Sequence, residues 1–377
     1  MWLFFRFSCA RLEQIRTIVR ITTTLVPNVT ISVVIPAYNG GPALRECLAS
    51  LAEHRDQFTE WIVVNDASTD DSIKFAEEFD VRVIHAPVRT GPANARNLGS
   101  MAATGDVLVF LDADVRIHDD TIPRIRQRFD ADPKLTALFG SYDTDPAVLG
   151  LVSEYRNLLH SFVHHTSKHN ASTFWSGCGA IRRETFLANG GFDVSFIVVE
   201  DIELGMRLVR QNLRVVLDPL IQVQHLKRWT LSSMITTDIR DRGIPWAKLI
   251  LSSHRMPNDL NLRWSNRFSV GLAPLLALSS ATVVGGALAG RLAEFMWPGL
   301  LALLVVFAAI AAINMPFYRF LADRRSFKFA SASMVLHLIY LFCCGASMGI
   351  AIGLHCWSFV QGRESREEAV SAIPPAE

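Results

Sequence analysis

The stretch DVLVFLDAD, residues 106–114, contains an apolar run that ends in two carboxylates. A short continuous apolar run of this kind is typical of a strand that is buried on both faces, as strands of parallel sheets are. Four further runs share this character: ISVVIPAY (31–38), WIVVND (61–66), VRVIHA (81–86) and LTALFGSY (135–142). Together they predict five strands of one sheet.

Helical patterns separate these runs. Apolar residues recur at helical spacing between the first two runs, at Leu44, Cys47, Leu48 and Leu51. After the second run, Ser68 is positioned to cap a helix that carries Ile73, Phe75 and Phe79. Strands that alternate with helices predict βαβ units, an α/β fold and a mainly parallel sheet. The ligand site of such a sheet is expected at the carboxyl ends of its strands.

Carboxylates stand where that site is expected. Asp112 and Asp114 would lie on one side of an extended strand, where their charges repel unless a divalent cation is near. Asp66 also ends an apolar run, and Glu200 and Asp201 begin a predicted helix. For each of these three, helix capping is the alternative explanation. The turn IPAYNGG lacks the GxGxxG pattern of dinucleotide-binding domains, which argues against hydride transfer.

The C-terminal third has a different composition. The chain of 377 residues is 50% hydrophobic and only 19% charged, where about 25% charged is typical of soluble proteins. Three stretches lack charge altogether: 268–290, 295–317 and 329–362. Because about 20 apolar residues cross a bilayer as a helix, we expect transmembrane spans near 268–290, 295–317 and 332–357. The alternative is three buried helices of a soluble domain.

Basic residues predict how these spans are oriented. The link between the second and third spans is basic, with Arg319, Arg324, Arg325 and Lys328, whereas the first link has Arg291 beside Glu294. By the positive-inside rule the basic link is cytoplasmic. The N-terminal α/β domain is then cytoplasmic too, and the chain after residue 360 lies outside.

The remaining composition excludes some classes of protein. Residues 1–267 hold 30 Lys or Arg and 30 Asp or Glu, and this balance argues against a nucleic-acid partner. The six cysteines lack the spacing of zinc or disulfide sites and are interpreted as free thiols in a reducing compartment. The N-terminus has no uninterrupted signal-peptide core, so residues 1–30 are interpreted as a basic arm.

The order of these motifs resembles the family 2 glycosyltransferases. The motifs, in chain order, are IPAYN (35–39), VNDASTDDS (64–72), PANARNLG (92–99), DAD (112–114), GCGAIRRETFLANGGFD (177–193) and the pair ED (200–201). The resemblance covers about residues 31–250 and implies a nucleotide-sugar-binding domain of the GT-A type. It also implies a divalent metal, Mg or Mn.

The resemblance assigns donor-site roles to individual residues. It implies that Pro36, Ala37 and Asn39 line a uridine pocket, that Asp66 binds the base or ribose, that Arg96 lies near the nucleotide, that Asp112 contacts the ribose, and that Asp114 holds the metal against the diphosphate. Gly177 and Gly179 would allow a sugar to approach closely, because glycine has no side chain.

The resemblance also implies how the reaction proceeds. Asp201 would be the general base of an inverting transfer, taking a proton from the acceptor hydroxyl, and Glu200 would orient it. His225 is a candidate third metal ligand, since imidazole with carboxylate suits Mn. The alternative for His225 is a strand-ending histidine bonded to backbone.

One departure concerns processive members of the family, which carry QxxRW. The nearest string here, from Gln224 to Trp229, is one residue too long. Arg242 and Trp246 are still expected to help close the donor site, because an arginine and an aromatic ring suit a diphosphate. The alternative is a membrane-surface helix that includes Trp246.

The sequence therefore predicts a membrane-anchored inverting glycosyltransferase of the plasma membrane. It moves a sugar from a UDP-linked donor onto a lipid-linked or cell-envelope glycan acceptor. A processive polysaccharide synthase and a non-catalytic pseudo-glycosyltransferase scaffold are the alternatives. The expected parts are a basic arm (1–30), the catalytic domain (31–250), an amphipathic linker (251–267), three transmembrane helices (268–362) and a polar tail (363–377).

Overall fold

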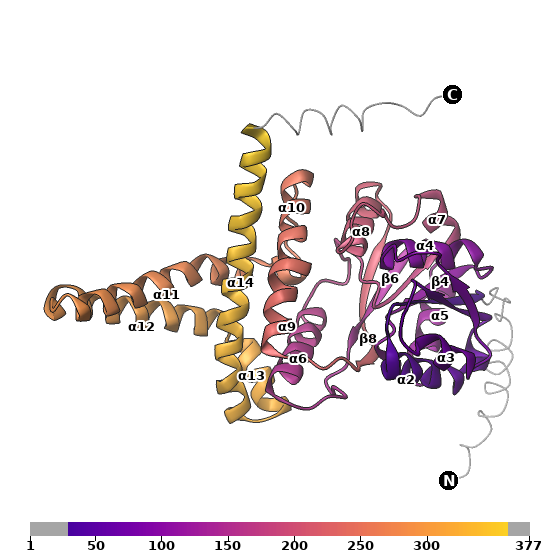
Figure 1. Ribbon diagram of the computed structural model, residues 1–377, viewed down its shortest axis with the longest axis horizontal. Coiled ribbons are helices and arrows are strands. Elements are labelled where there is room, and N and C mark those ends of the chain that lie inside the picture. The colour runs from indigo at the N-terminus through magenta and orange to yellow at the C-terminus, as the bar shows by residue number, and fades with distance from the viewer. Residues whose placement is uncertain (1–28, 361–377) are drawn as a thin grey trace, which may run out of the picture.

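The computed structural model describes residues 29–360, and its N-terminal part is built on one eight-stranded sheet (Figure 1). The strand order is β3-β2-β1-β4-β7-β6-β8-β5. The strands are β1 (Ile31–Ala37), β2 (Glu60–Asn65), β3 (Arg82–His85), β4 (Val107–Leu111), β5 (Val115–Ile117), β6 (Ala137–Tyr142), β7 (Cys178–Arg182) and β8 (Val215–His225). The pairs among β1 to β4 are parallel, as is β6 with β8, while β7 and β5 pair antiparallel with their neighbours. The prediction of a mainly parallel α/β sheet is confirmed.

Helices cover both faces of the sheet. One face packs against α2 (Gly41–Ala52), α3 (Ser72–Glu77) and α5 (Thr121–Ala131), and the other against α4 (Pro92–Ala102), α7 (Arg183–Ala188) and α8 (Glu200–Arg210). The four apolar residues predicted for the first helix are fully buried in this packing: Leu44, Cys47, Leu48 and Leu51. Burying a side chain of this kind contributes about 1.5–3 kcal/mol, so these contacts hold α2 on the sheet.

Two local predictions were wrong. Ser68 does not cap α3, whose N-terminal flanking residue is Asp71; the Ser68 hydroxyl instead accepts from the Asn39 N–H at 3.1 Å. The strand predicted over 106–114 ends at Leu111, because the chain turns at Asp112–Asp114 to leave β4 and to enter β5 beside β8. The two carboxylates are therefore brought together by a turn and not by the pleat of a strand.

The C-terminal part is helical. After α6 (Leu151–His165) and β8 come α9 (Leu231–Thr236), a π-helical turn η2 (Thr237–Asp241) and α10 (Gly243–Ser253). They are followed by α11 (Trp264–Leu288), the π-helical turn η4 (Leu292–Met296), α12 (Trp297–Ile313), α13 (Met315–Arg324) and α14 (Phe327–Val360). Three segments are long and apolar enough to cross a membrane: Trp264–Leu288, Glu294–Ile313 and Phe327–Ser358.

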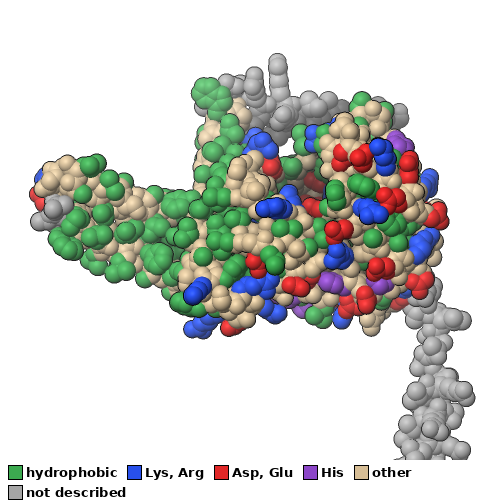
Figure 2. Space-filling model, turned by 60° about the horizontal axis from the view of Figure 1, so that its bottom comes forward, with side chains coloured by type: hydrophobic (Ala, Val, Ile, Leu, Met, Phe, Trp, Pro, Cys, Tyr) green, Lys and Arg blue, Asp and Glu red, His purple; other side chains and the backbone are tan. Residues whose placement is uncertain are grey.

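These candidate spans are not arranged as one parallel bundle. The hairpin of α11 and α12 projects crosswise from α14, and Figure 2 shows that hydrophobic side chains cover much of its visible face, with charged side chains at the tip. The helix α14 packs along α10 and against α6 and α13. The orientation predicted from the basic link assumed three spans in alternation, and it stays a prediction.

The predicted domain limits fall inside helices in two places. The boundary at 250 divides α10, and the proposed linker 251–267 includes the first turn of α11. Trp246 is only 8% exposed and packs with Val199 and Ile250, so it does not belong to an exposed membrane-surface face. The predicted tail lies outside the described residues, as does nearly all of the predicted basic arm.

Candidate functional site

Two cavities meet at the carboxyl edge of the sheet. The first, called the sheet-edge cavity, has a volume of about 510 Å³. Its walls come from the ends of β1 and β2, the start of α4 and the segment after β8. It is lined by Pro36, Ala37, Tyr38, Asn39, Gly40, Ala43, Asp66, Arg89, Gly91, Pro92, Arg96, Asp112, Ala113, Asp114, Leu226, Lys227 and Arg228.

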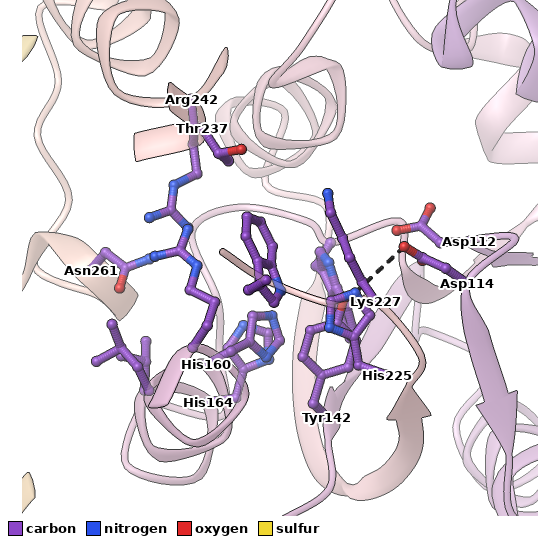
Figure 3. A pocket seen from close by; sticks show the side chains of 15 residues that line it. Asp112, Asp114, Tyr142, His160, His164, His225, Lys227, Thr237, Arg242 and Asn261 are labelled. Carbon is purple, nitrogen blue, oxygen red and sulfur yellow. Dashed lines mark ion pairs between the residues drawn. The ribbon is translucent and has the colours of Figure 1, made fainter. Parts of the chain in front are cut away.

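The second, called the helix-side cavity, has a volume of about 230 Å³ and lies between the sheet and the helical part (Figure 3). It is lined by Asp112, Asp114, Tyr142, Arg156, Leu159, His160, Val163, His164, Trp175, His225, Lys227, Trp229, Thr237, Arg242 and Asn261. Asp112, Asp114 and Lys227 line both cavities. The Asp112–Asp114 turn is thus the wall that the two cavities share.

Asp114 faces the end of β8. Its Oδ2 lies 3.6 Å from His225 Nε2, and the His225 ring stacks on Tyr142 with centroids 4.2 Å apart. Burial acts to raise the pKa of Asp114, but the hydrogen bond and charge of His225 and the charge of Lys227 lower it below its ordinary value. Asp114 is therefore held as a carboxylate next to an imidazole.

A buried arginine connects the two acidic motifs. Arg96 donates from Nη2 to Asp112 Oδ1 at 2.7 Å and from Nη1 to Glu200 Oε1 at 2.6 Å. Burial raises the pKa of Glu200 to about 7 and also raises the pKa of Asp112, although Arg96 opposes both shifts. Arg96, which was predicted to lie near the nucleotide, lines the sheet-edge cavity and fixes the shared turn to the start of α8.

Asp201 begins α8 as predicted, but both of its oxygens have protein partners. Oδ2 accepts from the Ser176 N–H at 3.0 Å and from the Ser176 hydroxyl at 3.1 Å, and Oδ1 accepts from the Ile202 N–H. Asp201 does not line either of the two cavities. Its partner Ser176 directly follows Trp175, which lines the helix-side cavity.

The residues predicted for the nucleotide pocket lie together. Pro36, Ala37, Asn39 and Asp66 all line the sheet-edge cavity. Asp66 also accepts from the N–H groups of Thr90 and Gly91 at 2.7 and 2.8 Å, so it holds the chain that enters α4. It does not cap α3, the helix that follows it, and its bonds go to the two residues before α4.

The two predicted glycines make room for the protein itself. A side chain at Gly177 would meet the Trp175 indole at 2.5 Å, and one at Gly179 would meet Phe174 at 2.4 Å. Neither glycine lines the two cavities. Their role toward a sugar stays a prediction. In the structure, the absence of side chains at these two positions leaves room for Trp175.

Arg242 and Trp246 are not on the sheet-edge cavity where a donor-closing role would need them. Arg242 lines the helix-side cavity, because η2 carries it to the end opposite Asp112 and Asp114 (Figure 3). Trp246 lines neither cavity and is buried beneath the start of α8. The helix α10 packs on α14, and this tertiary contact decides where both residues lie.

Sequence reasoning missed several lining residues. Arg89 lies over the Tyr38 ring, 3.9 Å from its centroid, and Lys227 and Arg228 follow β8 at the same edge. Their positions shortly after the ends of predicted strands were the signal in the sequence that could have identified these basic residues. Arg156 gave no such signal, because it reaches the site from the middle of α6. His160 and His164, on the same helix, also line the helix-side cavity.

The donor set at the shared turn suits a divalent metal. Carboxylate oxygen and imidazole nitrogen are ligands that Mn accepts. Asp114 contributes a carboxylate oxygen and His225 an imidazole nitrogen, and these two atoms lie close together. Within residues 29–360, no group of three or more His, Cys, Asp or Glu side chains is arranged to hold a metal alone. Substrate oxygens and water would have to complete the coordination, as is usual for Mg and Mn.

Comparisons with known proteins agree with this geometry. Residues 32–188 match the family described as Glycosyl transferase family 2. The poly-beta-1,6-N-acetyl-D-glucosamine synthase of Staphylococcus epidermidis is 27% identical over 186 residues, which are 47% of this chain and 45% of that protein. The pre-mycofactocin glycosyltransferase of Mycobacterium tuberculosis (strain CDC 1551 / Oshkosh) is 28% identical over 222 residues, 54% of this chain and 44% of that one. The chain thus spans about half the length of these curated relatives.

A solved structure shows the same fold. The mannosyltransferase PcManGT from Pyrobaculum calidifontis, in complex with GDP-Man and Mn2+, superposes with a TM-score of 0.54 and 22% sequence identity. The superposition covers 82% of this chain and 86% of that one. Residues 32–188 thus match glycosyltransferase family 2, and the N-terminal part has a GT-A-like fold that is followed by three candidate membrane helices.

Proposed function

We propose that this protein transfers a sugar from a nucleotide diphosphate sugar to a lipid-linked or cell-envelope glycan acceptor. The observation that carries the proposal is the meeting of two cavities at the Asp112–Asp114 turn. Transfer needs two substrates whose reacting atoms lie a few ångströms apart, and holding them so supplies a large part of the rate. One wall shared by two cavities meets this need.

The donor is proposed for the sheet-edge cavity. This cavity is the larger one and is lined by four cations, Arg89, Arg96, Lys227 and Arg228. Cations suit a diphosphate, and the exposed Tyr38 ring offers a surface for stacking a base. The family resemblance favours UDP, while the mannosyltransferase of the same fold was solved with GDP-Man, so both nucleotides belong in any test.

Asp114 and His225 would hold the metal, with Asp112 beside them. A bound Mg or Mn would neutralise charge on the diphosphate as it leaves. Asp114 is suited to this role because its lowered pKa keeps it ionised at neutral pH. Arg96 keeps Asp112 in place at the same turn.

The acceptor is proposed for the helix-side cavity, with inversion at the anomeric carbon. The acceptor oxygen attacks that carbon, the bond to the diphosphate oxygen breaks, and its electron pair leaves with the diphosphate. Asp201 takes the proton of the acceptor hydroxyl, which requires one of its hydrogen bonds to Ser176 to give way. Trp175, which lines this cavity next to Ser176 in the sequence, offers a ring face for a sugar.

A panel of nucleotide sugars with Mn tests the donor proposal. A ligand at 100 times its dissociation constant stabilises a protein by about 2.7 kcal/mol, which a thermal shift detects. We expect a shift with at least one UDP- or GDP-sugar and slow donor hydrolysis without acceptor. A scaffold without catalytic activity would bind and not hydrolyse. A processive synthase would give products that lengthen with time on a single enzyme.

A further inference from the structure

The helix-side cavity has a cationic end opposite the acidic turn. Arg156 on α6 and Arg242 after η2 converge on one carboxylate, that of Asp238. Arg156 Nη2 lies 2.7 Å and Arg242 Nη2 lies 2.9 Å from Asp238 Oδ1, and Arg156 Nη1 donates to Oδ2 at 3.2 Å. Figure 3 shows Arg242 on the other side of the cavity from Asp112 and Asp114.

This end carries one positive charge in excess. The side chain of Asp238 is completely buried and can neutralise only one of the two guanidinium groups. Burial opposes the charge of Arg242, yet Asp238 raises its pKa, so the group stays protonated. The acidic side chains among the lining residues are Asp112 and Asp114, which lie at the opposite end. Positive charge that is not neutralised is costly in a poorly solvated place, so this end is suited to an anion.

The middle of the cavity does not add charge. Burial, with the nearby His164, His225 and Arg242, lowers the pKa of His160 well below its ordinary value. Burial also lowers the pKa of His164 to about 4. Both imidazoles are neutral near pH 7, and with Trp175 they form an uncharged wall between the cationic end and the acidic turn.

The cationic end is built partly by a candidate membrane helix. Ser347 on α14 donates its hydroxyl hydrogen to the main-chain oxygen of Asp238 at 3.3 Å. A side chain at Gly243 would meet both that oxygen and Ser347, so η2 lies directly on α14. The carboxylate that positions both arginines is therefore fixed against a segment long and apolar enough to cross a bilayer.

We infer that Arg156 and Arg242 bind a phosphate group of a lipid acceptor, which turns the oxygen that receives the sugar toward the Asp112–Asp114 turn. The inference rests on the proposed function, because it names the acceptor class for the same site. Planar guanidinium groups match phosphate oxygens with two parallel hydrogen bonds. A lipid phosphate and a soluble phosphate share this chemistry, and the position against α14 favours the lipid.

The test uses the full chain purified in detergent and compares three probes: phytyl phosphate, phytol and inorganic phosphate. We expect phytyl phosphate to bind at least about tenfold more tightly than phytol, because charge-assisted hydrogen bonds are worth about 1.5–3 kcal/mol each. Inorganic phosphate should compete only weakly. Equal binding of phytyl phosphate and phytol would overturn the inference, and equal binding of phytyl phosphate and inorganic phosphate would overturn its assignment to a lipid.

Variants then locate the site. Arg242→Gln should weaken phytyl phosphate binding by about tenfold, while Arg242→Lys, which keeps the charge, should recover part of it. Arg240→Gln is the matched control, since Arg240 is 77% exposed and pairs with its neighbour Asp241. Arg242→Gln with wild-type affinity would contradict the inference. If Arg242→Gln misfolds, the comparison of phytyl phosphate, phytol and inorganic phosphate on the wild-type chain still tests the inference.

A separate measurement keeps the two proposals apart. Hydrolysis of a nucleotide sugar by the wild-type chain with Mn and no lipid tests the proposed function alone. Absent hydrolysis together with tight phytyl phosphate binding would overturn the proposed function and support the anion site. Hydrolysis of the donor without any preference for phytyl phosphate over phytol would support the proposed function and overturn the anion site.

Discussion

The two cavities differ in how the chain builds them, although they share one wall. The sheet-edge cavity is made from strand ends and the segments directly after them, so its lining residues fall within the ordered motifs of the sequence. The helix-side cavity is made by α6, η2 and the segment around Asn261, which tertiary packing brings to the sheet. The sheet-edge cavity therefore follows from local sequence, whereas the helix-side cavity depends on how the helical part packs against the sheet.

The largest effect is expected where the two cavities share a residue. Asp114→Asn should lower transfer and donor hydrolysis by about 100- to 1000-fold, because a preorganised charge at the leaving group is lost. The rate should be measured across a Mn titration. Asp119→Asn is the control, since Asp119 is fully exposed shortly after the same turn. Activity of Asp114→Asn within a few-fold of wild type would contradict the proposal that the reaction takes place at the turn shared by the two cavities.

The next effect concerns the side on which the acceptor is proposed to bind. Asp201→Asn should lower the transfer rate by about 100-fold, the size expected for a general base, with nucleotide affinity unchanged. Asparagine keeps an oxygen for the hydrogen bonds of Ser176, so the local structure should survive. Ser176→Ala is the companion variant and should cost much less. A transfer rate for Asp201→Asn within a factor of a few of wild type would show that Asp201 is not the base.

A smaller effect sharpens the contrast on the sheet-edge side. Arg89→Gln removes the cation from the Tyr38 ring and should weaken nucleotide binding by about threefold to tenfold. Binding of phytyl phosphate should not change, because Arg89 lines only the sheet-edge cavity. Arg82→Gln is a matched control, as the exposed Arg82 donates to the main-chain oxygen of Ala102. Loss of lipid binding in Arg89→Gln would show that the cavities are not separate.

The last prediction concerns neither rate nor affinity, and it is a pH dependence of stability. The pKa of Glu200 is raised by burial from 4.5 to about 7, so between these values the folded chain binds a proton that the unfolded chain releases. Stability from this group is complete below pH 4.5 and is lost as pH rises through about 7, by on the order of 3 kcal/mol. Thermal unfolding from pH 5 to 8 should show this slope, and Glu200→Gln should flatten it. Equal slopes would mean that Glu200 is ionised throughout this range.

The same contrast explains what could be predicted from the sequence. Apolar runs predicted the strands because buried strands require them, and Asp66, Asp112 and Asp114 were found because they directly follow those runs. The turn at Asp112 was missed, since an apolar run does not show where the chain leaves the sheet. Arg156 and Asn261 could not be predicted, because their positions depend on packing between distant segments. The positions of Arg242 and Trp246 depend on the same kind of packing, and their role toward the donor stays a prediction.

The most direct test of the central claim is an experimental structure of the full chain with Mn and either UDP or GDP. We predict that the nucleotide lies in the sheet-edge cavity near Tyr38 and Asp66, with its diphosphate and the metal at Asp114, and that the helix-side cavity stays open. A nucleotide bound among Arg156, His160 and Arg242, with the sheet-edge cavity empty, would contradict it.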